Sequence, residues 1–211
     1  MPHKPRFITF EGGEGAGKST QVRLLADALT DLGLAVLQTR EPGGAPGAEA
    51  LRTLLLSGQF AWSAPAEALL HFAARAEHVE KTIRPALAGG TWVVCDRFTD
   101  STMAYQGYGQ GADRAMIATL TRLMGIAPDV TIVLDVSEPV ALARLQARGD
   151  TADRYERLDA AFHTRVNEGF RAIARAERER CVLVPADGSA AEVHAAVMRV
   201  LWERVPALPR S

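Results

Sequence analysis

The chain has 211 residues, 47% of them hydrophobic and 23% charged, and this balance predicts one globular domain over residues 1–211. Its formal net charge of -1 provides no global basic field, which argues against nucleic-acid partners and against binding to an anionic membrane. The first residues contain no apolar stretch suited to export or membrane spanning, and Cys95 and Cys181 have no partner at metal-ligand spacing, so we expect a cytoplasmic protein.

The first predicted strand, Phe7–Phe10, leads directly into a P-loop that runs from Gly12 to Ser19. The glycines let successive backbone N–H groups and the N-terminus of the next helix face phosphate oxygens. Lys18 is expected to reach the β- and γ-phosphates and Ser19 to ligate Mg²⁺. The flanking strand and helix weigh against a plain glycine-rich turn. The expected contacts of ATP are Gly12, Gly13, Glu14, Gly15, Ala16, Gly17, Lys18, Ser19 and Thr20.

The helix after the P-loop shows apolar residues at spacings of three and four and ends at Gly33. A second strand, Ala35–Thr39, precedes a glycine-rich motif, Arg40 to Gly44. A further helical stretch runs from Pro65 to about Thr82. Two short glycine-rich segments, Gly43–Gly47 and Gly107–Gly111, are expected to be mobile loops over a site.

The third predicted strand, Trp92–Cys95, is followed at once by polar residues: Asp96, Arg97, Ser101, Thr102, Tyr105 and Gln106. An amphipathic helix then begins at Asp113 and ends at Gly125. The strands Val130–Val136 and Val182–Val184 and a last helix, Ala190 to Arg204, complete the pattern. Because buried apolar strands alternate with helices, we predict an α/β fold with a five-stranded parallel sheet flanked by helices.

An arginine-rich segment lies between the last two strands, over residues 144–157. It contains Arg144, Arg148, Arg154 and Arg157, with Gly149, Asp150 and Thr151 among them. We interpret it as a short flexible lid, followed by a long helix to about Arg180.

The motifs that follow the strands, together with Phe10-Glu11-Gly12, resemble in content and order those of bacterial thymidylate kinase. The resemblance extends from Phe7 to the last helix, nearly the whole chain. It implies a P-loop nucleoside monophosphate kinase that transfers a phosphoryl group from ATP to dTMP with Mg²⁺, on the path to dTTP. It also implies a homodimer. In open α/β sheets ligands bind outside the carboxyl ends of the strands, so these distant motifs can converge.

The resemblance assigns roles at the acceptor phosphate and sugar. Arg97 would hold the monophosphate, since a guanidinium can grip it in a fork. Asp96 would help organise the magnesium waters beside Ser19, and Glu14 would lie near the 3'-hydroxyl. Further expected contacts are Glu41, Pro42 and Arg52. A purely structural Asp96–Arg97 ion pair is the alternative.

The resemblance also assigns roles at the base. Arg75 matches the arginine that reads a thymine carbonyl, although an arginine on an amphipathic helix is most often solvated. His71 occupies the place of a phenylalanine that stacks on thymine, with Phe72 as a possible substitute. Tyr105 matches the tyrosine that crowds the sugar 2' position. Ser101, Thr102 and Gln106 complete the expected acceptor contacts.

The variable P-loop positions contain no arginine, so the resemblance requires the lid to supply the cation that stabilises the transferring phosphoryl group. We expect Arg148 and Arg154 to act there and Arg144 to stack on adenine. Asp153, Tyr155 and Glu156 follow the lid-base pattern. A solvated helix with alternating charges is the alternative for any single arginine.

Two other functions remain open. The chain could be a kinase for another nucleotide, such as dUMP or dCMP, or a nucleotide-driven binding module without an acceptor pocket. A chain that reads guanine would need an Asn-Lys-x-Asp segment, but the sole asparagine, Asn167, is followed by Glu168.

Overall fold

The computed structural model describes residues 6–149, 154–155 and 157–208, and of Arg148 only the backbone. One sheet runs through the molecule, with all of its strand pairs parallel and the order β2-β3-β1-β4-β5. Its strands are β1 (Phe7–Glu11), β2 (Val36–Arg40), β3 (Trp92–Asp96), β4 (Val130–Asp135) and β5 (Cys181–Pro185). The predicted five-stranded parallel sheet is confirmed.

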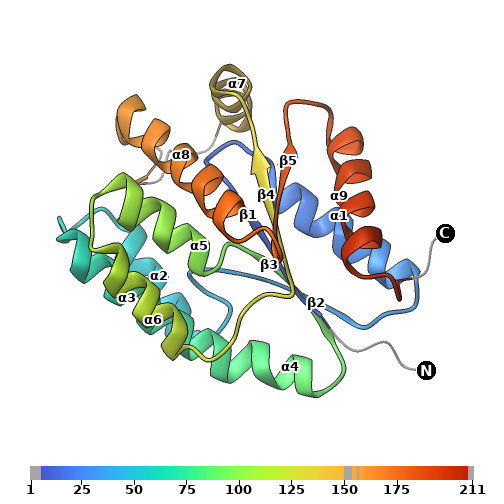
Figure 1. Ribbon diagram of the computed structural model, residues 1–211. Helices are drawn as coiled ribbons and strands as arrows, with labels where there is room; N and C mark the ends of the chain where they lie inside the picture. Colours follow the sequence, from blue (N-terminus) through green and yellow to red (C-terminus); the bar gives the residue numbers. More distant parts are fainter. Residues whose placement is uncertain (1–5, 150–153, 156, 209–211) are drawn as a thin grey trace.

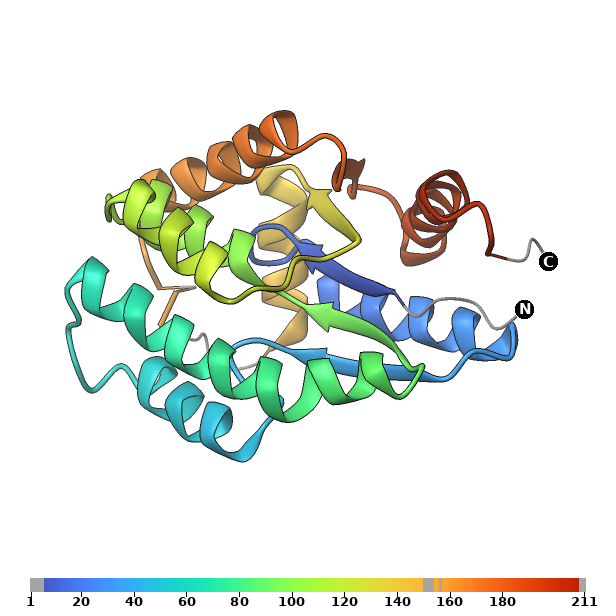
Figure 2. The same ribbon diagram turned by 60° about the horizontal axis from the view of Figure 1, so that its bottom comes forward.

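The helices flank the sheet on both sides (Figures 1 and 2). They are α1 (Lys18–Asp31), α2 (Pro46–Leu56), α3 (Ala64–His78), α4 (Arg84–Ala88), α5 (Thr99–Thr102), α6 (Arg114–Leu123), α7 (Glu138–Arg148), α8 (Ala160–Ala176) and α9 (Ala190–Arg204). Two π-helical segments, η1 (Val79–Ile83) and η2 (Met103–Gly109), continue α3 and α5. In the part of the chain that the structure describes, no helix is at once long and apolar enough to cross a bilayer.

The alternation of side chains along the strands separates two apolar cores. Ile8 and Phe10 of β1 face α1 and α9, where they pack with Leu25, Leu29 and Val197. Phe7, Val93 and Cys95 face the opposite side, together with Val79 and Ile83 of η1. On that side Val133 of β4 packs against α8 and η2. Because both faces are covered, the polar ends of the strands remain as the place for a site.

Several helix ends follow their expected capping chemistry. Asp113 accepts a hydrogen bond from the backbone N–H of Ala115 at 2.8 Å and so begins α6, as its sequence position predicts. At α9 a capping box joins Ser189 and Glu192.

Two expectations about loops and helix ends are wrong, and a third holds in part. Gly107–Gly111 is not a loop, because residues up to Gly109 belong to η2, where a Cβ on Gly109 would lie 2.6 Å from the Phe162 ring of α8. Gly43–Gly47 is irregular up to Ala45, as expected of a loop, and its last two residues belong to α2, which begins at Pro46. The helix before β5 ends at Ala176 rather than near Arg180.

Candidate active site

A cavity of about 700 Å³ lies at the carboxyl ends of β1, β2 and β3. Most of the residues predicted for the site line it: Glu14, Gly15, Gly17, Lys18, Ser19, Thr20, Glu41, Pro42, Arg52, His71, Arg75, Asp96, Arg97, Ser101, Thr102, Tyr105, Gln106 and Arg144. Residues that were not predicted also line it, among them Phe98, Leu145 and Arg40. The expected convergence of the motifs on one place is therefore found.

The P-loop connects β1 to α1 and turns through three glycines of positive φ, Gly12, Gly15 and Gly17. Lys18 begins α1, and its ammonium donates to the carbonyl oxygens of Gly12 at 3.1 Å and Gly13 at 2.7 Å. The lysine is buried, and this burial lowers its pKa, as does the nearby Arg97. A buried ammonium at a helix N-terminus provides the local positive charge that phosphate requires.

Ser19 and Asp96, the two predicted metal ligands, meet at the edge of the P-loop. The Ser19 hydroxyl donates to Asp96 Oδ2 at 2.6 Å. A hydroxyl and a carboxylate oxygen are the hard ligands that Mg²⁺ takes when waters and phosphates complete its shell. The donor set present here therefore fits that ion.

Arg97 is held in a strained backbone conformation. Its φ of 69° is the one positive value among non-glycine residues that the structure describes. One guanidinium nitrogen donates to Gly12 O at 3.0 Å and to Ser101 Oγ at 3.1 Å. The other donates to Glu14 Oε1 at 2.6 Å and to Tyr105 OH at 3.0 Å. Four partners thus fix a charged fork directly beside the P-loop.

Glu14 stays ionised within this cluster although it is largely buried. Burial disfavours its charge, but Arg97 and Lys18 outweigh this cost and lower its pKa to about 2. Its Oε1 atom also accepts a hydrogen bond from the Tyr105 hydroxyl at 2.7 Å. An acid in a P-loop therefore has the cationic partners that its position requires.

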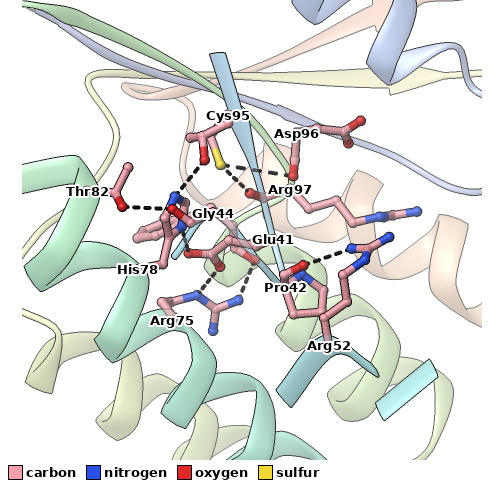
Figure 3. Close-up of polar contacts among 12 residues, drawn as sticks. Glu41, Pro42, Gly44, Arg52, Arg75, His78, Thr82, Cys95, Asp96 and Arg97 are labelled. Carbon is pink, nitrogen blue, oxygen red and sulfur yellow. Dashed lines mark hydrogen bonds and ion pairs between the residues drawn. The ribbon is translucent and has the colours of Figure 1, made fainter. Parts of the chain in front are cut away.

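Arg75 is not solvated, so that alternative is wrong. Its side chain is 2% exposed, and Nε donates to Glu41 Oε2 at 2.6 Å (Figure 3). Its Nη2 atom donates to Phe98 O at 2.9 Å and Thr102 Oγ1 at 3.1 Å. The remaining nitrogen, Nη1, has no hydrogen-bond partner among the described residues. A buried donor that lacks a partner and belongs to a residue lining the cavity is suited to a ligand oxygen.

Glu41 has a more definite part than the sequence suggested. Its carboxylate lies between Arg75 and the ring nitrogen His78 Nδ1, which is 3.0 Å from Glu41 Oε1 (Figure 3). Next to it, Arg52 donates to the carbonyl oxygen of Pro42 at 2.8 Å. The motif after β2 therefore positions two arginines of the cavity.

The structure distinguishes the two residues that were expected to stack on the base. His71 lines the cavity, and its Nε2 atom is 2.9 Å from the hydroxyl of Tyr155. Phe72 is 4% exposed and packs with Ala68 and Ile117 in an apolar cluster instead. Phe72 is thus wrong as an expected substrate contact, because it occupies the core-facing side of α3.

Two of the predicted lid arginines, Arg144 and Arg154, have different surroundings. Arg144 lies between the P-loop and the start of α9, where it donates to Gly15 O at 3.5 Å and Gly188 O at 2.8 Å. Arg154 instead forms an ion pair with the fully buried Glu67 at 2.6 Å and lines a second, separate cavity. The expected phosphate contact of Arg154 is not found in this arrangement, because Glu67 supplies its anion.

Part of the predicted lid lies outside the described residues. This holds for Asp150, Thr151, Asp153 and Glu156 and for the side chain of Arg148.

Sequence reasoning missed two buried acids. Glu11 at the end of β1 is 0% exposed and accepts hydrogen bonds from Phe98 N at 2.7 Å and Ser101 Oγ at 2.6 Å. Burial and the nearby Asp100 raise its pKa to about 7. The signal for Glu11 was present, since an acid that ends an apolar strand must find donors there. For Glu67, within an ordinary helical pattern, no such signal existed.

The chain matches a family model described as thymidylate kinase over residues 10–197. It is 53% identical to a thymidylate kinase of Gluconobacter oxydans, over 96% of this chain and 97% of that protein. It is 51% identical to one of Caulobacter vibrioides, over 94% of this chain and 97% of that protein. Among solved structures, a thymidylate kinase from Ehrlichia chaffeensis superposes with a TM-score of 0.78 at 38% identity, covering 93% of this chain and 98% of that one.

Proposed function

The chain belongs to the thymidylate kinase family and is a phosphotransferase, and from this premise we propose which residues bind ATP, Mg²⁺ and dTMP and transfer the γ-phosphoryl group. The observation that carries the proposal is the arrangement of Arg97 and its four hydrogen-bond partners. It presents a fixed guanidinium fork beside Lys18 of the P-loop, within a single cavity. Two phosphate-binding cations side by side suit a donor and an acceptor phosphate.

ATP would bind with its phosphates along the backbone of the P-loop and against Lys18. Arg144 lies beside the loop and beside the residues that precede α9, so we propose that it stacks on adenine. Ser19 and Asp96 would hold Mg²⁺, directly or through its waters. The ion, when bound, bridges the donor phosphates and neutralises the charge that develops on them.

The monophosphate of dTMP would bind to Arg97, with Arg52 as a second cation. Figure 3 shows the guanidinium groups of both arginines extending toward the same side of Pro42. The free Arg75 Nη1 atom would donate to a carbonyl oxygen of the base. His71, which lines the same cavity, would stack on the base ring. These two contacts support a pyrimidine with an exocyclic oxygen as the proposed acceptor base.

The sugar and the remaining base contacts are proposed from the Glu14–Tyr105 pair and its neighbours. Glu14 would lie near the 3'-hydroxyl, and Tyr105 would crowd the 2' position and favour deoxyribose. Ser101 and Thr102 lie on α5, shortly after Arg97 in the chain, and line the cavity, and we propose that they face the base. The two hydroxyls are already oriented by Arg97 and Arg75, so they present a preformed wall.

The transfer itself needs little covalent help from the protein. The attacking oxygen of the acceptor phosphate is already ionised at neutral pH, so no strong general base is required. Catalysis then consists of alignment and of stabilising the charge on the transferred group, which Lys18 and Arg97 can do. We propose Arg148 as the lid cation, since Arg154 is paired with Glu67. We also propose a cytoplasmic homodimer, in line with the resemblance and with the unpaired Cys95 and Cys181.

A coupled assay of ADP release with a panel of nucleoside monophosphates tests this function. The unmodified protein should prefer dTMP to dUMP and dCMP. Arg97→Ala should still bind ATP but lose transfer by on the order of a thousandfold, since it removes a charged fork from the reacting phosphates. Arg23→Ala, which alters an exposed ion pair on α1, is the matched control. ATP turnover independent of any acceptor, or an unchanged rate in Arg97→Ala, would contradict the proposal.

A further inference from the structure

Glu67 on α3 is fully buried, and four side chains donate to its carboxylate. The proposed phosphoryl transfer gives this carboxylate no role. Its Oε1 atom accepts hydrogen bonds from Gln106 Nε2 at 2.8 Å, Gln110 Nε2 at 2.7 Å and Tyr155 OH at 2.8 Å. Its Oε2 atom lies 2.6 Å from Arg154 Nη1. We call these five residues the Glu67 cluster. They come from α3, from η2 and the residue that follows it, and from the segment before α8.

The carboxylate fixes where the protons of this cluster lie. A carboxylate can only accept, so the NH₂ group of Gln106 must face Glu67. Gln106 lines the acceptor cavity, and we infer that its amide oxygen, the polar atom that does not face Glu67, is the one presented to a ligand there. The Tyr155 hydroxyl must donate to Glu67 for the same reason, so its oxygen accepts from His71 Nε2–H.

His71 is thereby held in one neutral form. Burial, and after it the neighbouring Arg75, lowers its pKa to about 3, so the ring is uncharged at neutral pH. Its single proton is on Nε2, because that atom must donate to Tyr155. Glu67 thus determines which atoms donate and which accept in two residues of the acceptor cavity, His71 and Gln106.

We propose that Glu67 is a positioning residue that ties the base of the lid to the acceptor cavity and sets its hydrogen-bonding pattern. Arg154 and Tyr155 stand at the lid base, and both bind the same carboxylate that orients Gln106. The cavity then offers an acceptor from Gln106 and a donor from Arg75. This pattern complements an imide edge, a carbonyl beside a ring N–H, and opposes the amino group and bare ring nitrogen of cytosine. This step rests on the proposed function.

Replacing Glu67 with glutamine tests the proposal at nearly constant shape. An amide is neutral and has a single acceptor atom, so Arg154 loses its anion in either orientation. If the NH₂ group faces the former Oε1 position, the three donors there lose their acceptor as well. The KM for dTMP should rise on the order of tenfold or more. The preference for dTMP over dCMP should fall by a similar factor, whereas the KM for ATP should stay within about twofold. Glu80→Gln, in an exposed i,i+4 ion pair on η1, is the matched control.

Hydrogen exchange provides a readout that does not depend on activity. Because Leu158 N donates to Tyr155 O, the amides of residues 157–165 should exchange faster in Glu67→Gln than in the unmodified protein, with no nucleotide present. Tyr155→Phe, which removes one hydroxyl only, should shift both readouts in the same direction by a smaller factor. If Glu67→Gln fails to fold, Tyr155→Phe tests the proposal in its place.

The possible failures are distinguishable. If the unmodified protein releases no ADP with dTMP, the proposed function fails, and the exchange measurement still tests the tie between Glu67 and the lid base. If exchange, the KM for dTMP and the preference over dCMP are all unchanged in both variants, Glu67 has no positioning role.

Discussion

At the scale of single residues, the site is built around buried charges whose costs are offset locally. Glu14 and Glu11 illustrate opposite outcomes. Arg97 and Lys18 keep Glu14 ionised, with a pKa lowered to about 2, so its contribution to stability is present above the usual pKa near 4.5 and lost as the pH falls toward 2. Burial and Asp100 raise the pKa of Glu11 to about 7 instead.

The raised pKa of Glu11 predicts that folding stability falls as the pH rises. Between pH 4.5 and 7 the native state holds a proton on Glu11 that the unfolded chain has released, so the free energy of unfolding decreases with pH over that window. Glu11→Gln removes this titration. The loss of stability between pH 5 and pH 8, measured by urea unfolding, should shrink by roughly 2 to 3 kcal/mol.

The control for Glu11→Gln is Glu203→Gln, an exposed position on α9. It should leave the difference between pH 5 and pH 8 unchanged. An equal pH dependence in Glu11→Gln and the unmodified protein would show that burial does not raise the pKa of Glu11.

Residues that belong to a recognisable sequence motif could be assigned to the site from the sequence. The residues of the P-loop and of the Asp96-Arg97 pair after β3 come together as predicted: Glu14, Lys18, Ser19, Asp96 and Arg97. Sequence reasoning fails where a buried partner decides the outcome. Phe72 and His71 are adjacent on one helix, and only the packing of α3 shows which faces the cavity. Arg154 looks like any lid arginine until Glu67 is seen beside it.

At the scale of elements, η2 is held against α8 by the absence of side chains at two glycines. A Cβ on Gly109 would lie 2.6 Å from Phe162 Cε2, and one on Gly169 would lie 2.9 Å from Tyr108. Neither glycine has a positive φ, so close approach and not backbone freedom requires them. This contact fixes the helix that bears Tyr105 and Gln106.

Gly109→Ala should therefore destabilise the protein by about 1 to 3 kcal/mol, the typical cost of overpacking. The added methyl group would push η2 from α8, so the KM for dTMP should rise as well. Gly89→Ala is the control, because Gly89 lies exposed at the end of α4 with its nearest contact at 3.3 Å. Thermal unfolding and steady-state kinetics measure both effects, and a Tm equal to that of Gly89→Ala would contradict the packing argument.

The strands and most helices could be predicted from the sequence, because the period of the apolar residues follows which side of each element is buried. Gly107–Gly111 contains the glycines that usually mark a loop, but here glycine serves close packing between helices. The predicted helical stretch from Pro65 to about Thr82 covers α3 and most of η1, and only its continuation into α4 was not predicted.

At the scale of the whole molecule, a single cavity at the carboxyl ends of the strands has two chemically different ends. Arg144 of α7 contacts the P-loop and the residues before α9, whereas Arg75 of α3 contacts Glu41, Phe98 and Thr102. The two arginines share no partner. With Arg144 proposed for the donor and Arg75 for the acceptor, binding of the two substrates can therefore be altered separately.

This separation predicts that substitutions at the two ends act independently. Arg144→Ala should raise the KM for ATP about tenfold and leave the KM for dTMP nearly unchanged, because it removes only a donor-side contact. Arg75→Lys keeps a charge beside Glu41 but loses the fork, so it should raise the KM for dTMP about tenfold and spare ATP. Because the sites share no contacts, the factors by which kcat/KM falls should multiply in the double variant to within about threefold. A double variant far from that product, with thermal unfolding showing both single variants folded, would mean that α7 and α3 move as one unit when the substrates bind.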